Sequence, residues 1–178
     1  MMCTATTQER TSAAYRHQIS VRKTDMYQRI LVPIDGSPTS RRGLQEAMAV
    51  AKLTNASVRL IHVVDQLPFT LSLDPTTAWT GDMYTMLREA GQAIVNEGKA
   101  QLDAAGVPGD IALKDTLEGR VCDLVLEEAA HWGADLIVIG THGRRGPGRL
   151  LLGSDAEQIL RLAPVPVLLV RLSGPATP

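Results

Sequence analysis

The segment from Gly140 to Asp155 holds the residue types in this chain that are best suited to bind an anion. It contains five glycines and three arginines, and it leads into an apolar pattern of helical spacing. Glycine lets the main chain approach an oxyanion closely, and the N–H groups at a helix start point toward an anion bound there. Arginines add local positive charge to a chain whose formal net charge is −1. The segment therefore predicts a phosphate site.

One other interpretation of this segment stays open on the residues alone. It is a flexible turn, in which Ser154 is an ordinary helix N-cap and the arginines are solvated. Two common phosphate motifs are absent, because Ser154 stands where GxxxxGK[ST] needs lysine, and no GxGxxG follows the first strand. The pattern therefore favours neither a P-loop enzyme nor a Rossmann dehydrogenase.

The histidines give a weak signal for catalysis. His62 falls inside an apolar run, which favours a packed and hydrogen-bonded core histidine, whereas His142 lies in the glycine segment and could touch a phosphate or face solvent. Neither has a partner at metal-ligand spacing, so we expect no structural metal. No paired acid and base and no GxSxG elbow are present, and efficient hydrolysis is not predicted.

Apolar runs alternating with helical patterns must position these residues. We expect strands over 29–35, 57–65, 111–117, 134–140 and 165–171, and helices over 38–54, 87–102, 121–132 and 154–163. The order indicates an α/β fold with a single doubly wound, five-stranded parallel sheet and four helices. In such sheets ligands bind beyond the carboxyl ends of the strands, where strand order reverses. The carboxyl ends of the predicted strands lie at Asp35, Val63–Asp65, Glu118–Gly119 and Gly140.

The stretch 66–84 lacks periodicity and is longer than most connections. Its apolar residues could cover a ligand, contact a second subunit or pack on the domain's own helices. These residues are Phe69, Leu71, Leu73 and Trp79.

Length and composition predict one domain over 26–172, with flexible tails at 1–25 and 173–178. A start at Met26 is the alternative for the first tail. The balanced charge predicts no nucleic-acid partner, and apolar runs well short of ~20 residues predict no membrane span. Two distant cysteines, Cys3 and Cys122, suit the reducing cytoplasm.

The spacing of Gly140, Gly143, Gly153 and Ser154 matches G-x2-G-x9-G-[ST], and the chain thereby resembles the universal stress protein family. The likeness extends over nearly all of 26–172, including the runs 30–37, 60–64, 134–144 and 164–170. It implies an adenine nucleotide alpha-hydrolase-like sheet of order 3-2-1-4-5, a bound ATP with or without Mg²⁺, and a homodimer joined along 165–171.

The resemblance also assigns the contacts. Asp35 would meet the nucleoside and Val63 the adenine through its main chain, while Gly140, Gly143, Gly153 and Ser154 would meet ribose and phosphates. The remaining residues that it implies near the nucleotide are Pro33, Thr141, Arg144 and Asp155.

Asp155 departs from the family, which commonly has a small apolar residue there. A carboxylate beside phosphates repels them unless a divalent cation lies between, so Asp155 would weaken binding or help to hold Mg²⁺. A first-turn acid favoured by the helix dipole is the simpler interpretation.

Three functions follow as hypotheses. The first is an ATP-binding regulatory protein of the stress response. The second is a slow ATPase or nucleotidyl-transfer enzyme, and the third is a stress protein that acts through protein contacts without a nucleotide.

Overall fold

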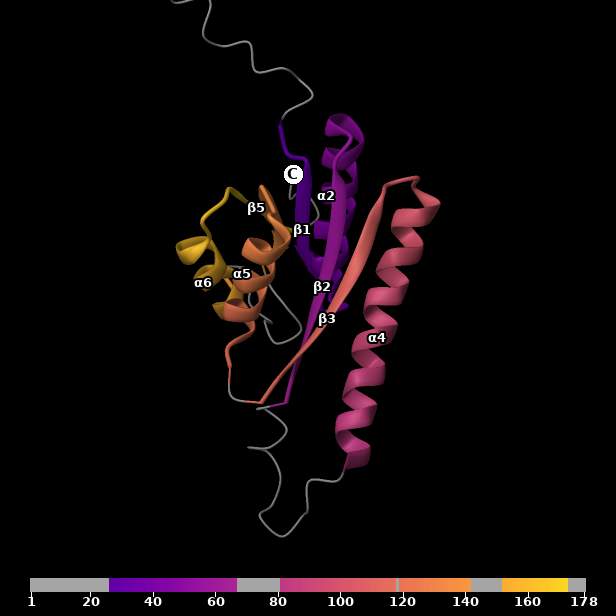
Figure 1. The fold of residues 1–178 in the computed structure, drawn as a ribbon, viewed down its shortest axis with the longest axis vertical. Helices are drawn as coiled ribbons and strands as arrows, with labels where there is room; N and C mark the ends of the chain where they lie inside the picture. The colour runs from indigo at the N-terminus through magenta and orange to yellow at the C-terminus, as the bar shows by residue number, and fades with distance from the viewer. Residues whose placement is uncertain (1–25, 67–80, 118, 142–151, 173–178) are drawn as a thin grey trace, which may run out of the picture.

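The computed structural model describes residues 26–66, 81–117, 119–141 and 152–172, which form a five-stranded parallel sheet. The strands are β1 (Arg29–Pro33), β2 (Ser57–Asp65), β3 (Gly109–Thr116), β4 (Leu136–Gly140) and β5 (Val167–Val170). Their order is β3-β2-β1-β4-β5, and every neighbouring pair is parallel (Figure 1). The predicted fold and strand order are confirmed, and strand order reverses at β1, between β2 and β4.

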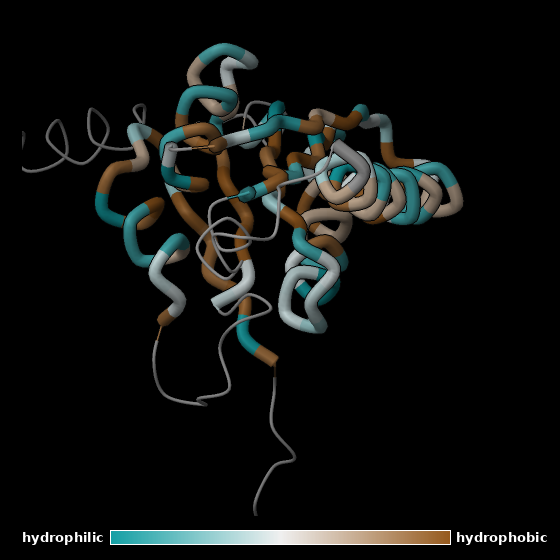
Figure 2. Tube along the Cα trace, turned by 90° about the horizontal axis from the view of Figure 1, so that it is seen from below, coloured by the Kyte–Doolittle hydropathy of each residue, from teal (hydrophilic) through white to brown (hydrophobic). Residues whose placement is uncertain are grey.

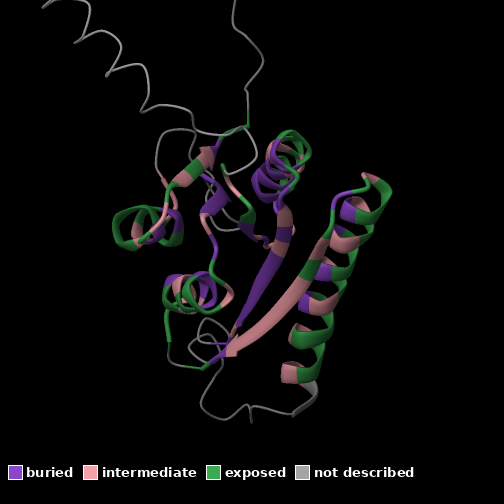
Figure 3. Cartoon of the chain, turned by 45° about the horizontal axis from the view of Figure 1, so that its top comes forward, coloured by how far each residue is buried: buried purple, intermediate pink, exposed green. Residues whose placement is uncertain are grey.

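Four helices cover the two faces of this sheet. Helices α2 (Pro38–Thr54) and α4 (Gly81–Ala104) lie on one face, and α5 (Val121–Trp132) and α6 (Ser154–Leu162) lie on the other. Figure 2 shows the hydrophobic strands enclosed between these helix layers, and Figure 3 shows that the outward faces of the helices carry the exposed residues. The layers follow from strand alternation, because successive side chains of a strand point to opposite faces.

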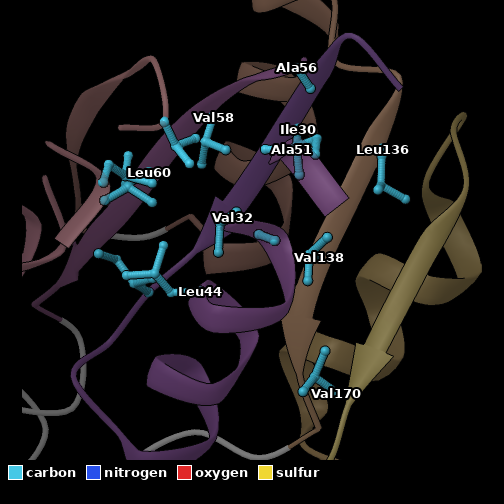
Figure 4. Close-up of a cluster of buried hydrophobic side chains, with 14 of the residues drawn as sticks. Ile30, Val32, Leu44, Ala51, Ala56, Val58, Leu60, Leu136, Val138 and Val170 are labelled. Carbon is cyan, nitrogen blue, oxygen red and sulfur yellow. The ribbon is translucent and has the colours of Figure 1, made fainter. Parts of the chain in front are cut away.

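Two apolar clusters form the core. On the α2 and α4 face, Ile30, Val32 and Leu60 pack with the helices, as the close-up in Figure 4 shows. Leu31 and Ile61 point the other way and pack against α5 and α6. All five side chains are at most 1% exposed. Continuous apolar strands are buried on both faces, which is why the sequence shows apolar runs here without alternation.

The helix ends agree with local sequence signals. Ser37 caps α2 by accepting a hydrogen bond from the Ser40 N–H, and Pro38 is the first helical residue. Asn55 and Gly133 end α2 and α5 in the left-handed conformation, at φ of 58° and 71°.

Two sequence expectations need correction. Helix α4 begins at Gly81, inside the stretch expected to be irregular up to Tyr84, because the helical spacing of Met83, Met86 and Leu87 continues the apolar pattern one turn earlier. Strand β1 ends at Pro33 rather than Asp35, since the chain turns at Gly36, whose φ is +78°. Phe69, Leu71, Leu73 and Trp79 lie outside the described residues, as do both tails.

Within the described ranges, we find no helix that combines the length and the apolar composition needed to span a bilayer.

Candidate functional site

The carboxyl ends of β1 and β4 bring Asp35 and Gly140 to the place where strand order reverses. Asp35 is half-buried in the turn between β1 and α2. Its carboxylate Oδ1 accepts a hydrogen bond of 2.9 Å from the Ser37 N–H, and its own N–H donates to Ser40 Oγ at 3.4 Å. The carboxylate is thus oriented by the first turn of α2.

Three buried hydroxyl groups support this turn. Ser37 Oγ lies 3.1 Å from Thr39 Oγ1, and Ser40 Oγ donates to the Ser37 carbonyl at 3.0 Å. Each of the three residues is at most 7% exposed. Sequence reasoning identified Ser37 as an N-cap but missed the cluster, for which the hydroxyl-rich run after Asp35 was the available signal.

Gly140 is required where α2 crosses the end of β4. A Cβ at this position would lie 2.8 Å from the Thr39 carbonyl carbon and 3.1 Å from the Ser40 nitrogen, both main-chain atoms. Real Cβ atoms do not approach that closely, so glycine lets the start of α2, and with it the Asp35 turn, pack directly on β4.

The chain returns to the same edge of the sheet through Thr141 and Gly153. Thr141 is buried; its N–H donates to the Val170 carbonyl, and its carbonyl accepts from the Gly153 N–H, each at 2.9 Å. Gly153 is the N-cap of α6 and supplies no side-chain cap, while Ser154 and Asp155 are exposed in the first turn. The positive end of α6 therefore faces solvent beside the end of β4.

Asp155 also influences its neighbours. It shares the first turn of α6 with Glu157, where acids are favoured by the helix dipole. Burial and then Asp123 raise the pKa of the Cys122 thiol on α5, the charge of Arg120 opposes them, and the charge of Asp155 makes the smallest contribution.

Pro33 ends β1, and Val63 lies on the neighbouring strand β2. Pro33 is the last β1 residue and pairs with Ile61, so Val63 lies two residues further along β2. Main-chain groups two residues apart in a strand point the same way. Because the Ile61 carbonyl accepts from the Ile34 N–H on the β1 side, the Val63 main chain points into the space beyond β1.

Eight of the predicted site residues lie together at the carboxyl end of the sheet: Pro33, Asp35, Val63, Gly140, Thr141, Gly153, Ser154 and Asp155. The predicted site residues Gly143 and Arg144 lie outside the described residues, together with His142, Arg145 and Arg149. Across the described ranges, His, Cys, Asp and Glu side chains form no group of three that could hold a metal ion.

A different cluster, which sequence reasoning missed, lies between α5 and the strands β2 and β3. The buried Glu128 carboxylate accepts from Arg59 Nη1 at 2.8 Å and lies 3.0 Å from Lys114 Nζ. Burial alone would raise the pKa of Glu128, but the hydrogen bonds from Lys114 and Arg59 outweigh burial and hold that pKa below its usual range. Arg59 also binds Asp110 and stacks over the Trp132 ring at 4.8 Å. A cavity of about 230 Å³ lies beside Asp110 and Trp132.

Known proteins resemble this chain over most of its length. The family model described as the universal stress protein family matches residues 26–171. A universal stress protein of Methanocaldococcus jannaschii is 36% identical over 147 residues, which cover 83% of this chain and 84% of that protein.

Two solved structures extend the comparison. A universal stress protein family member from Burkholderia pseudomallei has a TM-score of 0.66 and 31% identity, covering 82% of this chain and 96% of its own. A universal stress protein in complex with cAMP has a TM-score of 0.58 and 27% identity, covering 83% and 99%. The family model and the relative each cover more than four-fifths of the sequence, and the chain belongs to the universal stress protein family.

Proposed function

We propose that this protein binds an adenine nucleotide, ATP in the first place, at the edge where β1, β4 and α6 meet. One observation carries the proposal. The N-terminus of α6 has a glycine N-cap without a side-chain cap, and it opens beside Gly140 in the same edge as Asp35. An anion held there would accept hydrogen bonds from first-turn amides that the helix itself cannot use.

The remaining groups fit the other parts of a nucleotide. The Asp35 carboxylate can accept hydrogen bonds from ribose hydroxyls, and the Val63 main chain points into a space that an adenine edge could enter. The Gly153 N–H donates to Thr141, and the phosphate donors that we propose are the amides of Ser154 and Asp155 and the Ser154 hydroxyl. Gly143 and Arg144 complete the proposed set, and Pro33 and Thr141 shape its walls.

The relative solved with cAMP supports the chemistry, because cAMP shares adenine, ribose and a phosphate with ATP. ATP carries more negative charge, which the carboxylates of Asp155 and Glu157 oppose and Mg²⁺ would offset. We therefore expect ATP to bind more tightly with Mg²⁺ than without it, while the affinity for cAMP is unchanged by the cation.

Calorimetry with ATP, ATP plus Mg²⁺ and cAMP tests the proposal. An Asp35→Asn variant keeps the acceptor for the Ser37 N–H but loses the charge, and it should bind ATP roughly tenfold more weakly. Asp110→Asn at the amino end of β3 is the matched control and should bind as the unchanged protein does. The proposal would be contradicted if none of the three ligands gave binding heat, or if Asp35→Asn and Asp110→Asn lost the same amount of ATP affinity.

In this proposal the nucleotide acts as a regulatory ligand, within a stress response in the cytoplasm. The proposed contacts are hydrogen-bond donors and a carboxylate already oriented by Ser37, and they include no acid and base pair that could activate water. ATP incubated with the protein should therefore be turned over near the background rate. A steady-state rate abolished by Ser154→Ala or Asp155→Asn would favour the slow-enzyme alternative instead.

The proposal includes a homodimer joined along β5. Among the described strands, β5 pairs with β4 alone. Leu168 within β5 and Leu172 just after it are 38% and 50% exposed. An apolar sheet edge pairs readily with a second copy. Sedimentation should give a dimer mass, and Leu168→Lys should shift it toward the monomer, with Leu53→Lys on α2 as control.

A further inference from the structure

His62 on β2 makes a contact that joins two parts of the candidate site. Its side chain is 4% exposed, and its Nδ1 lies 2.7 Å from the carbonyl oxygen of Ile34. A carbonyl oxygen can only accept a hydrogen bond, so Nδ1 carries the proton and donates it. The core interpretation made from the sequence is therefore confirmed, and the acceptor of the hydrogen bond is identified.

The acceptor lies directly before Asp35. Ile34 follows the last residue of β1, and its N–H donates to the Ile61 carbonyl at 2.8 Å. With His62 bound to its carbonyl, Ile34 is held to β2 at both main-chain groups. The next residue is Asp35, whose carboxylate is oriented from its other side by Ser37. The chain at the Asp35 turn is therefore fixed from β2 and from α2.

His62 also lies directly before Val63 in β2. The main chain of Val63 and the carboxylate of Asp35 belong to different strands, and β1 and β2 stop pairing at Pro33 and Ile61. The hydrogen bonds that Ile34 makes with Ile61 and His62 extend this register beyond the strand end. They set the separation between the proposed adenine and ribose contacts.

Helix α4 leaves room for the ring at a glycine. A Cβ at Gly91 would lie 2.8 Å from His62 Cδ2, 3.0 Å from Val64 Cγ2 and 3.2 Å from His62 Nε2, so alanine there would displace the ring and crowd Val64. Alanine is the better helix former by about 1 kcal/mol. A buried glycine in the middle of α4 is therefore explained by the space that His62, and next to it Val64, needs.

We propose that His62, seated against Gly91, is a positioning residue that fixes Asp35 for the ribose of a bound adenine nucleotide. This inference rests on the proposed function for its ligand, but its structural part concerns Asp35 alone. His62 acts through the Ile34 carbonyl and does not itself touch the nucleotide.

The test compares ATP with 2′,3′-dideoxyATP, which lacks both ribose hydroxyls. The unchanged protein should prefer ATP by roughly tenfold, the worth of a hydrogen bond to a charged group. His62→Leu should reduce that preference to about twofold or less while the affinity for 2′,3′-dideoxyATP stays within about twofold. A general loss of stability would weaken both ligands equally and would overturn the inference.

Rescue provides the conservative control. His62→Asn places an amide N–H near the former Nδ1 and should restore most of the preference for ATP. Gly91→Ala should reduce the preference as His62→Leu does, but it should have little effect in the His62→Asn background, where the smaller side chain leaves space. His131→Leu, an exposed histidine near the end of α5, should change nothing.

Amide hydrogen exchange separates this inference from the proposed function. In His62→Leu the Ser37 amide, which donates to Asp35, should exchange roughly tenfold faster, while amides of β4 keep their rates. If the unchanged protein binds neither nucleotide, the proposed function fails and the Ser37 rate alone decides the positioning role. An unchanged Ser37 rate in His62→Leu overturns that role whatever the affinities are.

Discussion

Two regions of the parallel sheet use their polar groups in opposite ways. Between α5 and the strands β2 and β3, charged side chains pair with one another, and Glu128 is held by both Arg59 and Lys114 while 5% exposed. At the carboxyl end of the sheet, a main-chain N–H and buried hydroxyls orient the Asp35 turn, and the N-terminus of α6 has a glycine N-cap with no side-chain cap. The charged cluster is paired within itself, whereas the carboxyl end presents hydrogen-bond donors for a ligand.

This difference indicates which residues stabilise the fold and which are available for ligand binding. A buried charge costs free energy unless it is paired, so a network such as Arg59, Glu128 and Lys114 is sensitive to the loss of any partner. Exposed helix amides cost little in water and gain when an anion arrives. Changes away from the carboxyl end, in this charged network or at the amino end of the sheet, should therefore alter the stability of the protein alone. Changes at the carboxyl end of the sheet should alter ligand binding.

Gly140→Ala should give the largest effect at the carboxyl end. Its new Cβ would meet the main chain of Thr39 and Ser40, so we expect a loss of about 3 kcal/mol in unfolding free energy and a displaced Asp35 turn. Urea unfolding and calorimetry with ATP measure the two effects. Gly109→Ala is the matched change at the amino end, where the Cβ would meet the Val58 carbonyl. It should cost similar stability and leave ATP affinity unchanged, and equal loss of affinity in both would remove the distinction.

Glu128→Gln should reduce the unfolding free energy by about 2 kcal/mol at neutral pH, because Arg59 and Lys114 lose a buried charged partner. The pKa of Glu128 is lowered in the folded protein. Its contribution is therefore complete above the usual glutamate range and is lost as the pH falls through the lower folded pKa. Unfolding measured at pH 7 and at lower pH should show a difference in stability between the two proteins that is largest at pH 7 and shrinks as the pH falls. A difference that does not shrink, or a change in ATP affinity, would contradict this account.

Gly153→Ser should give the smallest change in stability and the sharpest change in binding. Gly153 has φ −63° and ψ 147°, which serine adopts easily, and a serine N-cap gains a few tenths of a kcal/mol over glycine. The new hydroxyl would accept from the first-turn amides that we assign to phosphate. We expect ATP to bind several-fold more weakly while adenosine is unaffected, as calorimetry with both ligands would show. Equal weakening of adenosine would place the phosphates elsewhere.

The fold could be predicted because its signals are local. Buried strands such as β1 and β4 appear as apolar runs, and Ser37, Asn55 and Gly133 mark helix ends by their own conformational preferences. The start of α4 was missed although Met83, Met86 and Leu87 have helical spacing, because this first turn is only partly buried and follows a stretch without periodicity. The candidate site was predicted as a set of strand ends and a glycine pattern, and the binding role of its residues stays a prediction.

By itself, the sequence determined the α/β class, the order of elements and the family. Periodicity, caps and motif spacing depend on residues a few positions apart. Only the tertiary structure decided that His62 holds the residue before Asp35 and that Glu128 lies between Arg59 and Lys114. Such contacts depend on strand register and on which face of the sheet a side chain occupies. Register and face are set only when segments distant in the sequence pack together. A buried polar group then forms its hydrogen bond with whichever partner the packed chain brings close to it.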